Sequence, residues 1–145
     1  MARRLFTAGC WILIAMALVH LLGHYGMTTA QGDDEAERQM LALMRGERQD
    51  MGLGMVRSMM DIVTGFSLAF SLFGASSGLF GLLALRHERS FPGLLRPLAI
   101  AYAGVFGVLS GIGLRYWFPA PLAFILGAFL CFVGAVAAGA RPRAR

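Results

Sequence analysis

The sequence has little charge and no lysine. Only 14% of its 145 residues are charged, against about 25% in an ordinary soluble domain, and all 13 basic residues are arginines. The mean hydropathy is +0.65. This composition argues against a soluble domain and favours a membrane protein.

The sequence also lacks the short motifs that mark common enzymes. It contains no glycine-rich phosphate loop, no Gly-x-Ser-x-Gly elbow, no HExxH and no CxxC. The two cysteines, Cys10 and Cys131, stand far apart and predict no disulfide framework. The pI is about 10.2, but basic patches interleaved with aromatic residues are missing, so we expect no nucleic-acid partner. No motif implies a cofactor.

Four windows of the sequence contain no charged residue at all. Together they hold 95 of the 145 residues, and each reaches the roughly 18 apolar residues that a membrane-spanning helix needs. The sequence therefore predicts an all-α fold, a four-transmembrane-helix bundle that forms a single membrane domain over residues 1–145. The windows are Leu5–Gly32, Ile62–Leu85, Pro97–Leu114 and Tyr116–Ala140.

Proline positions agree with this division of the chain. All five prolines lie at or between span ends, where a missing N–H does little harm. They are Pro92, Pro97, Pro119, Pro121 and Pro142. The expected spans cover residues 5–25, 58–85, 95–117 and 120–140.

Arginine positions predict the orientation of the chain in the membrane. Eight arginines belong to the two termini and the second loop, whereas four of the other five share the first loop with six acidic residues from Asp33 to Asp50. Since positive residues near span ends stay in the cytoplasm, we expect both termini inside and the long first loop outside the cell (inner) membrane. The eight are Arg3, Arg4, Arg86, Arg89, Arg96, Arg141, Arg143 and Arg145.

The N-terminal segment has an alternative interpretation as a cleaved signal. Arg3 and Arg4 precede an apolar run, and Thr28-Thr29-Ala30 loosely resembles a small-residue cleavage site. The run from Leu5 to Leu22 exceeds the usual 7–15 residues of a signal's apolar region, so we expect a retained span.

Small residues recur every four positions in the last three spans. Such ladders let helix backbones approach closely, which is how helices pack where lipid supplies no hydrophobic driving force. We therefore expect spans two, three and four to pack tightly, although the same faces would also suit a second protomer or another membrane subunit. The glycines expected at helix contacts are Gly74, Gly78, Gly107, Gly111, Gly127 and Gly134.

The first loop, residues 33–57, is expected to be helical, with a break near Gly52–Gly54. Its first turn is acidic, which suits a helix N-terminus. Methionines recur at intervals of four and seven and would share one helix face, where their thioethers could hold Cu(I) or fill gaps against the bundle. We favour packing against the bundle as the role of these methionines. The methionines are Met40, Met44, Met51, Met55 and Met59.

Polar residues at the outer ends of the spans are the candidate functional layer. The predicted topology brings the end of span one, the start of span two and the end of span three to one depth. An ionisable residue at this depth is costly unless it is compensated, so it is a candidate for function. The layer consists of His20, His24, Tyr25, Arg57, Asp61 and Arg115.

Each member of this layer also has an ordinary explanation. His20 and His24 are one turn apart and could present two nitrogens to a metal, but satisfied hydrogen-bonding histidines are the commoner case. Asp61 could pair with Arg57 or Arg115, or it could handle a ligand or a proton. Arg115, beside aromatic residues, also suits a simple interface anchor.

The chain resembles a group of small, uncharacterised bacterial four-span integral membrane proteins. The resemblance rests on four segments and covers most of the chain. It implies a four-helix bundle with a shared polar layer, and it brings no established activity. The segments are Leu22-Gly23-His24, Arg57-Ser58 with Asp61, Gly65-Phe66-Ser67-Leu68, and Tyr116-Trp117-Phe118-Pro119-Ala120-Pro121.

Three functions remain open on the sequence alone. The leading one is a non-enzymatic accessory or scaffold bundle, favoured by the small-residue ladders and the missing motifs. The alternative is a protein that binds or transports a small ligand, lipid or metal through the layer of His20, His24, Asp61 and Arg115. The least favoured is a membrane enzyme with His24 and Asp61 as an acid–base pair.

Overall fold

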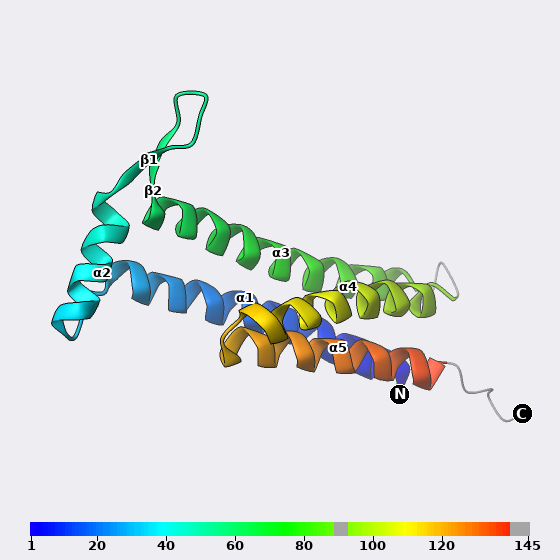
Figure 1. Ribbon diagram of the computed structural model, residues 1–145. Coiled ribbons are helices and arrows are strands. Elements are labelled where there is room, and N and C mark those ends of the chain that lie inside the picture. Colours follow the sequence, from blue (N-terminus) through cyan, green and yellow to red (C-terminus); the bar gives the residue numbers. More distant parts are fainter. Residues whose placement is uncertain (89–92, 140–145) are drawn as a thin grey trace, which may run out of the picture.

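The computed structural model describes residues 1–88 and 93–139 (Figure 1). This part of the chain forms five helices and one two-stranded hairpin. The elements are α1 (Ala2–Thr29), α2 (Glu35–Gly46), β1 (Arg48–Asp50), β2 (Val56–Ser58), α3 (Met59–His87), α4 (Leu95–Tyr116) and α5 (Pro119–Gly139).

Four of these helices, α1, α3, α4 and α5, are long and apolar enough to cross a membrane. Their order and approximate bounds agree with the four expected spans. At about 1.5 Å per residue, α1 with 28 residues is about 42 Å long, whereas α4 with 22 is about 33 Å. Helices α1 and α3 therefore exceed a hydrocarbon core of about 30 Å by about two turns, whereas α4 and α5 only just span it.

The helices run alternately up and down, so their ends gather at two ends of the bundle. We call the end where α1 stops and α3 starts the hairpin end, because α2 and the β-hairpin lie there (Figure 1). The connection from Trp117 to Phe118, the α4–α5 corner, faces the same way, and α1 and α3 extend past it (Figure 1). At the opposite end, Arg3 pairs with Glu88 at 3.8 Å, and a Cβ at Gly139 would lie 4.0 Å from the Cβ of Ala2.

Helix α1 occupies the centre of the bundle. It packs along both α3 and α5, and α4 packs on α5, while α3 and α4 meet at few positions. One of these is the hydroxyl of Tyr102, which donates to the carbonyl oxygen of Ser77 at 2.6 Å. The expectation that spans two, three and four pack tightly together is therefore correct for spans three and four and wrong for span two, which packs mainly on span one.

Glycines permit this close packing on α1. A Cβ at Gly78 would lie 2.5 Å from the carbonyl oxygen of Cys10, and one at Gly74 would lie 2.6 Å from the Cε of Met16. In the other interfaces, a Cβ at Gly134 would lie 3.2 Å from the Leu5 side chain, and one at Gly107 would lie 3.1 Å from the Phe129 ring. Two of the expected contact glycines stand apart from this pattern. They are Gly127, where a Cβ would come no closer than 3.8 Å to another helix, at Ile12, and Gly111, where a Cβ would meet nothing within 4 Å.

An aromatic cluster joins α1, α4 and α5 in the half of the bundle away from the hairpin. Phe132 is fully buried and lies 4.9 Å from Tyr102, 5.2 Å from Phe6 and 5.6 Å from Phe106, measured between ring centroids. Gly9 makes room for it, because a Cβ there would fall 2.7 Å from the Phe132 ring. Such edge-to-face and tilted aromatic contacts add to the dispersion energy of the core.

The segment between the first two spans is helical only in its first half. Helix α2 begins after Asp34, whose carboxylate accepts the backbone N–H of Glu37 at 2.8 Å. At its other end, Arg45 donates to the carbonyl oxygens of Thr28 and Ala30 at 3.0 and 2.7 Å. These bonds satisfy carbonyls at the end of α1 that have no partner within the helix, and they tie α2 to α1.

The second half of that segment forms the antiparallel hairpin, which corrects the expectation of a broken helix. Arg48, Gln49 and Asp50 pair with Ser58, Arg57 and Val56. Gly52, Leu53 and Gly54 all have positive φ, as a tight reversal requires. The methionines consequently share no helix face, because Met51 and Met55 lie in the hairpin and only Met40 and Met44 belong to α2.

Some residues of the expected pattern lie outside the described residues. They are Arg89 and Pro92 in the second loop and Arg141, Pro142, Arg143 and Arg145 near the C-terminus.

Candidate functional site

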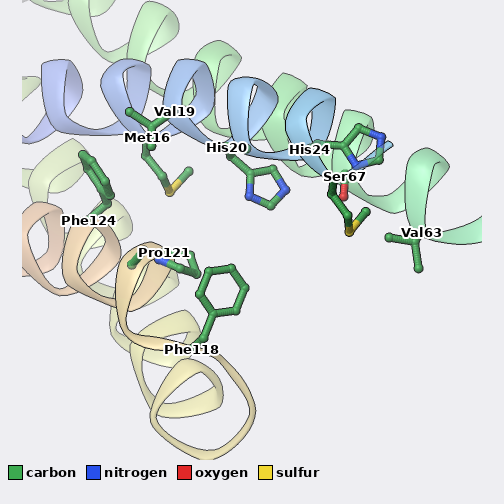
Figure 2. Close-up of a pocket in the computed structure, with 12 residues that line it drawn as sticks. Met16, Val19, His20, His24, Val63, Ser67, Phe118, Pro121 and Phe124 are labelled. Atoms are coloured by element: carbon green, nitrogen blue, oxygen red, sulfur yellow. The ribbon is translucent and has the colours of Figure 1, made fainter. Parts of the chain in front are cut away.

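A cavity opens at the hairpin end, between α1, α3 and the α4–α5 corner (Figure 2). Its volume is about 460 Å³, within the range of about 300–1,000 Å³ typical of small-molecule sites. It forms where α1 and α3 run on beyond the shorter pair. The wall consists of Met16, Val19, His20, Gly23, His24, Met27, Val63, Ser67, Phe118, Ala120, Pro121 and Phe124.

His24 is the most enclosed polar side chain of this wall. Its residue is 9% exposed, and its Nδ1 atom is buried without a hydrogen-bond partner in the described residues. Buried polar atoms in native structures nearly always have partners, and leaving one unsatisfied costs about 1–3 kcal/mol. His24 also lines the cavity, so it is the polar group of the wall that most lacks a hydrogen-bond partner.

His20, one turn earlier on α1, points into the cavity towards the α4–α5 corner (Figure 2). Its ring packs edge-on against Phe70 at 5.0 Å between centroids, and Phe70 packs in the same manner against Trp117 at 5.4 Å. This aromatic chain links α1, α3 and the α4–α5 corner. It also borders an adjoining hollow of about 400 Å³, whose wall shares His20, Ser67, Phe118 and Pro121 with the main cavity.

Asp61 has a structural role at the start of α3 and does not line the cavity. Its backbone N–H donates to the hydroxyl of Ser58 at 3.1 Å, and its carboxylate accepts the N–H of Ser58 at 2.9 Å. This reciprocal capping box satisfies two N–H groups at the start of the helix. Within the described residues Asp61 forms no ion pair, and Arg57 instead donates to its neighbour's carbonyl oxygen, that of Val56, at 2.9 Å.

The remaining two residues of the expected layer are exposed. Tyr25, near the end of α1, is 68% exposed and does not line the cavity, and the Arg115 guanidinium lies over the ring of Tyr116 at 5.7 Å. The structure therefore brings His20 and His24 into one cavity, while Tyr25, Arg57, Asp61 and Arg115 lie outside its wall. An acid–base pair of His24 and Asp61 has no support in this arrangement.

The two histidines also lack further metal ligands. Across residues 1–88 and 93–139, no group of three His, Cys, Asp or Glu side chains comes together as a metal site would require. Cys10 is buried in the opposite half of the bundle, and Cys131 is likewise a free thiol.

Most wall residues were not predicted from the sequence, because they are apolar or small and carry no functional motif. Met16, Gly23 and Met27 lie four before, three after and seven after His20, so they share its helix face. On α3, Val63 and Ser67 are likewise one turn apart. Helical periodicity counted from His20 identifies the α1 residues of the wall. The position of Phe118 and Pro121 in the wall depends on tertiary packing, which the sequence does not show.

No protein-family model matches the chain, and comparisons with curated proteins and with solved structures likewise find no match.

Proposed function

We propose that this protein is a small membrane protein that binds a small apolar or amphiphilic ligand in the cavity around His20 and His24. The observation that carries the proposal is the unsatisfied Nδ1 of His24 in the wall of a cavity of about 460 Å³. A mostly apolar pocket with a few convergent polar groups is the usual form of a small-molecule site.

The residues of this proposed binding site differ from the polar layer expected from the sequence. His20, His24 and Ser67 provide the polar groups, and Met16, Phe118 and Phe124 provide apolar surface. Asp61 and Arg115 take no part in binding. A metal is the weaker ligand, because the pair lacks a third side chain of the usual metal-binding types in the described residues.

Native mass spectrometry of the protein purified in mild detergent tests this function. The wild type is expected to carry a copurifying small molecule, and Ser67→Phe, which fills the cavity, is expected to lose it. Leu68→Phe is the matched control, because Leu68 is the next residue on α3 and is exposed away from the wall. A wild type whose mass is that of the bare polypeptide, with no bound molecule, would overturn the proposal.

An accessory or scaffold bundle is the second candidate function. Gly104 and Gly111 lie seven residues apart on one exposed face of α4, and nothing lies within 4 Å of a Cβ at either position. Such a face suits close approach by another membrane helix. Under this function, Gly104→Phe would abolish a cross-linked partner or dimer, whereas Ser67→Phe would leave it intact.

The orientation proposed with this function places both termini in the cytoplasm and the cavity at the extracytoplasmic side of a bacterial inner membrane. The arginine distribution supports it. A membrane-impermeant thiol reagent applied to intact cells is expected to label a cysteine introduced at Gln31, which is exposed after the end of α1. Labelling only after the cells are opened would contradict this orientation.

A further inference from the structure

We infer that the ligand of this cavity is an uncharged amphiphile, with a hydroxyl or carbonyl head and an apolar tail, that enters from the bilayer. This inference rests on the proposed function and deepens it by naming the ligand class. It is carried by the chemistry of the wall, by the placement of the polar groups within it and by the helix packing around it.

The wall carries no formal charge opposite a charged head. None of its twelve residues is Asp, Glu, Lys or Arg. The charged residues closest in sequence to the wall residues make other contacts. Asp61 caps α3, and the Arg115 guanidinium lies over the ring of Tyr116. Burying a carboxylate or ammonium without a partner costs far more than burying a hydroxyl or carbonyl that is hydrogen-bonded. An uncharged head is therefore the one this wall accepts.

The polar side chains of the wall lie together, with apolar residues on both sides of them. On α1, Met27 lies three residues beyond His24 towards the hairpin end, and Met16 lies eight residues before His24, which is about 12 Å along the helix axis. His20 and Ser67 lie on the side of His24, whereas Phe124 lies near Met16 (Figure 2). A head that hydrogen-bonds to the imidazoles would thus extend its tail along Met16 and Phe124, towards the middle of the bundle.

The adjoining hollow between α3 and the α4–α5 corner provides a lateral route, because its wall is shared in part with the cavity and is bordered by Phe70 and Trp117. Helix α3 packs mainly on α1, and its hydrogen bond with α4, from Tyr102 to Ser77, lies about ten residues beyond Ser67 along α3. The flanking side chains of this route, Phe66 and Phe118, are exposed and apolar. Apolar side chains at the mouth favour entry from lipid, because a molecule dissolved in the hydrocarbon region reaches them without crossing water.

Quenching of tryptophan fluorescence tests the ligand class directly. Trp11→Phe leaves Trp117 as the single tryptophan, and Trp117 borders the hollow beside His20. In proteoliposomes of this variant we compare dodecanol, dodecanoate and dodecylamine, each with a terminal bromine as quencher. We expect saturable quenching by the alcohol, with half-saturation at a mole fraction at least about ten-fold lower than for the two charged analogues.

Variants of the histidine pair connect the quenching to the proposed contact. His24→Leu is expected to raise the half-saturating mole fraction of the alcohol about ten-fold, the effect of losing one buried hydrogen bond. His24→Asn keeps a polar group of similar reach and is expected to retain most of the binding. Tyr25→Phe is the matched control, since Tyr25 is the neighbouring residue and lies outside the wall. Equal binding by His24→Leu and wild type would overturn the role of His24.

The outcomes separate the ligand class from the function on which it rests. Equal or tighter saturable quenching by dodecanoate or dodecylamine would overturn the uncharged head and leave a ligand site in place. Quenching by all three that rises linearly without saturation would reflect partitioning into lipid alone and would overturn the proposed function as well. Adding empty liposomes tests entry from the bilayer. The added lipid lowers the mole fraction of the ligand, so occupancy of the cavity is expected to fall. Constant occupancy of the cavity after this dilution would contradict lateral entry.

Discussion

Single glycines decide how closely the helices approach, and their effect depends on what faces them. Gly78 and Gly65 lie on the same helix, α3, yet a Cβ at Gly78 would meet the backbone of α1 and a Cβ at Gly65 would meet nothing within 4 Å. The sequence pattern identified Gly78 as a packing residue. It could not identify the partner helix, since a four-residue spacing describes one face without saying what covers it.

Gly78→Ala is expected to loosen the contact between α1 and α3. The added methyl would overlap the carbonyl oxygen of Cys10, and backbone cannot yield as a flexible side chain can. We expect a loss of about 2 kcal/mol in the free energy of unfolding, measured by denaturant titration in detergent micelles. Gly65→Ala is the control and is expected to be neutral or to gain up to about 1 kcal/mol from better helix propensity. Equal stability of the two variants would contradict the close approach.

The carboxylate of Asp61 was also assigned too specialised a role from sequence. Its position at the edge of a span suggested an ion pair or a functional acid, but the residue three positions earlier is a serine, and together they form a capping box. The Ser-x-x-Asp spacing of a capping box is visible in the sequence. The prediction of a functional acid instead followed from the rarity of acidic residues at membrane depth.

Ser58→Ala is expected to fray the first turn of α3. Loss of the cap should cost about 1 kcal/mol and speed amide hydrogen exchange at residues 59–62 about five-fold. Arg57→Gln should leave both quantities unchanged, because Arg57 forms no ion pair with Asp61 in the described structure. A larger effect of Arg57→Gln than of Ser58→Ala would indicate the ion pair instead of the cap.

At the scale of elements, the hairpin is where sequence periodicity and local backbone preference disagree. The methionine spacing is helical, but Gly52-Leu53-Gly54 favours a reversal, and the reversal prevails. Three local hydrogen bonds hold it: Met51 N–H to the Met55 carbonyl oxygen, Met55 N–H to the Gly52 carbonyl oxygen, and Gly52 N–H to the Asp50 carboxylate. Residue spacing alone does not show whether the helical pattern or the turn residues will prevail.

Gly52→Ala is expected to destabilise this hairpin although its surroundings are open. Its φ of +85° is unfavourable for any residue with a Cβ, at a cost of about 1 kcal/mol or more. Leu53, which is 98% exposed at φ +54°, offers the opposite test, because Leu53→Gly removes that strain and loses no packing. Hydrogen exchange at the Met51 amide should be about five-fold faster in Gly52→Ala and no faster in Leu53→Gly. Slower exchange in Gly52→Ala would contradict the assigned turn.

At the scale of the whole molecule, charge distribution was sufficient to predict four spans and their approximate bounds. It could not predict that α1 would be central, because the aromatic and glycine contacts of α1 involve three different helices. The cavity follows from the same arrangement. It depends on the difference in length between the α1–α3 pair and the α4–α5 pair, together with the corner residues that close one side.

Phe132→Ala is expected to weaken the bundle as a whole. The side chain is 0% exposed and lies among aromatic rings of α1 and α4, so its removal should cost about 3 kcal/mol through the cavity left behind. Phe80→Ala removes the same atoms from a position that is 64% exposed and should cost less than about 1 kcal/mol. Denaturant titration of both variants provides the comparison. Similar losses would show that the aromatic cluster is not the core.

The most direct test of the central claim, that the cavity at the hairpin end binds an uncharged amphiphile, is to map where such a molecule lies. A dodecanol with a photoactivatable diazirine in its tail is reconstituted with the protein, illuminated, and located by peptide mass spectrometry. We predict labelling concentrated on Met16, Phe124 and their neighbours in the wall, competed by unmodified dodecanol and lost in Ser67→Phe. Labelling spread evenly over the exposed faces of α3 and α4, with no competition, would contradict the claim.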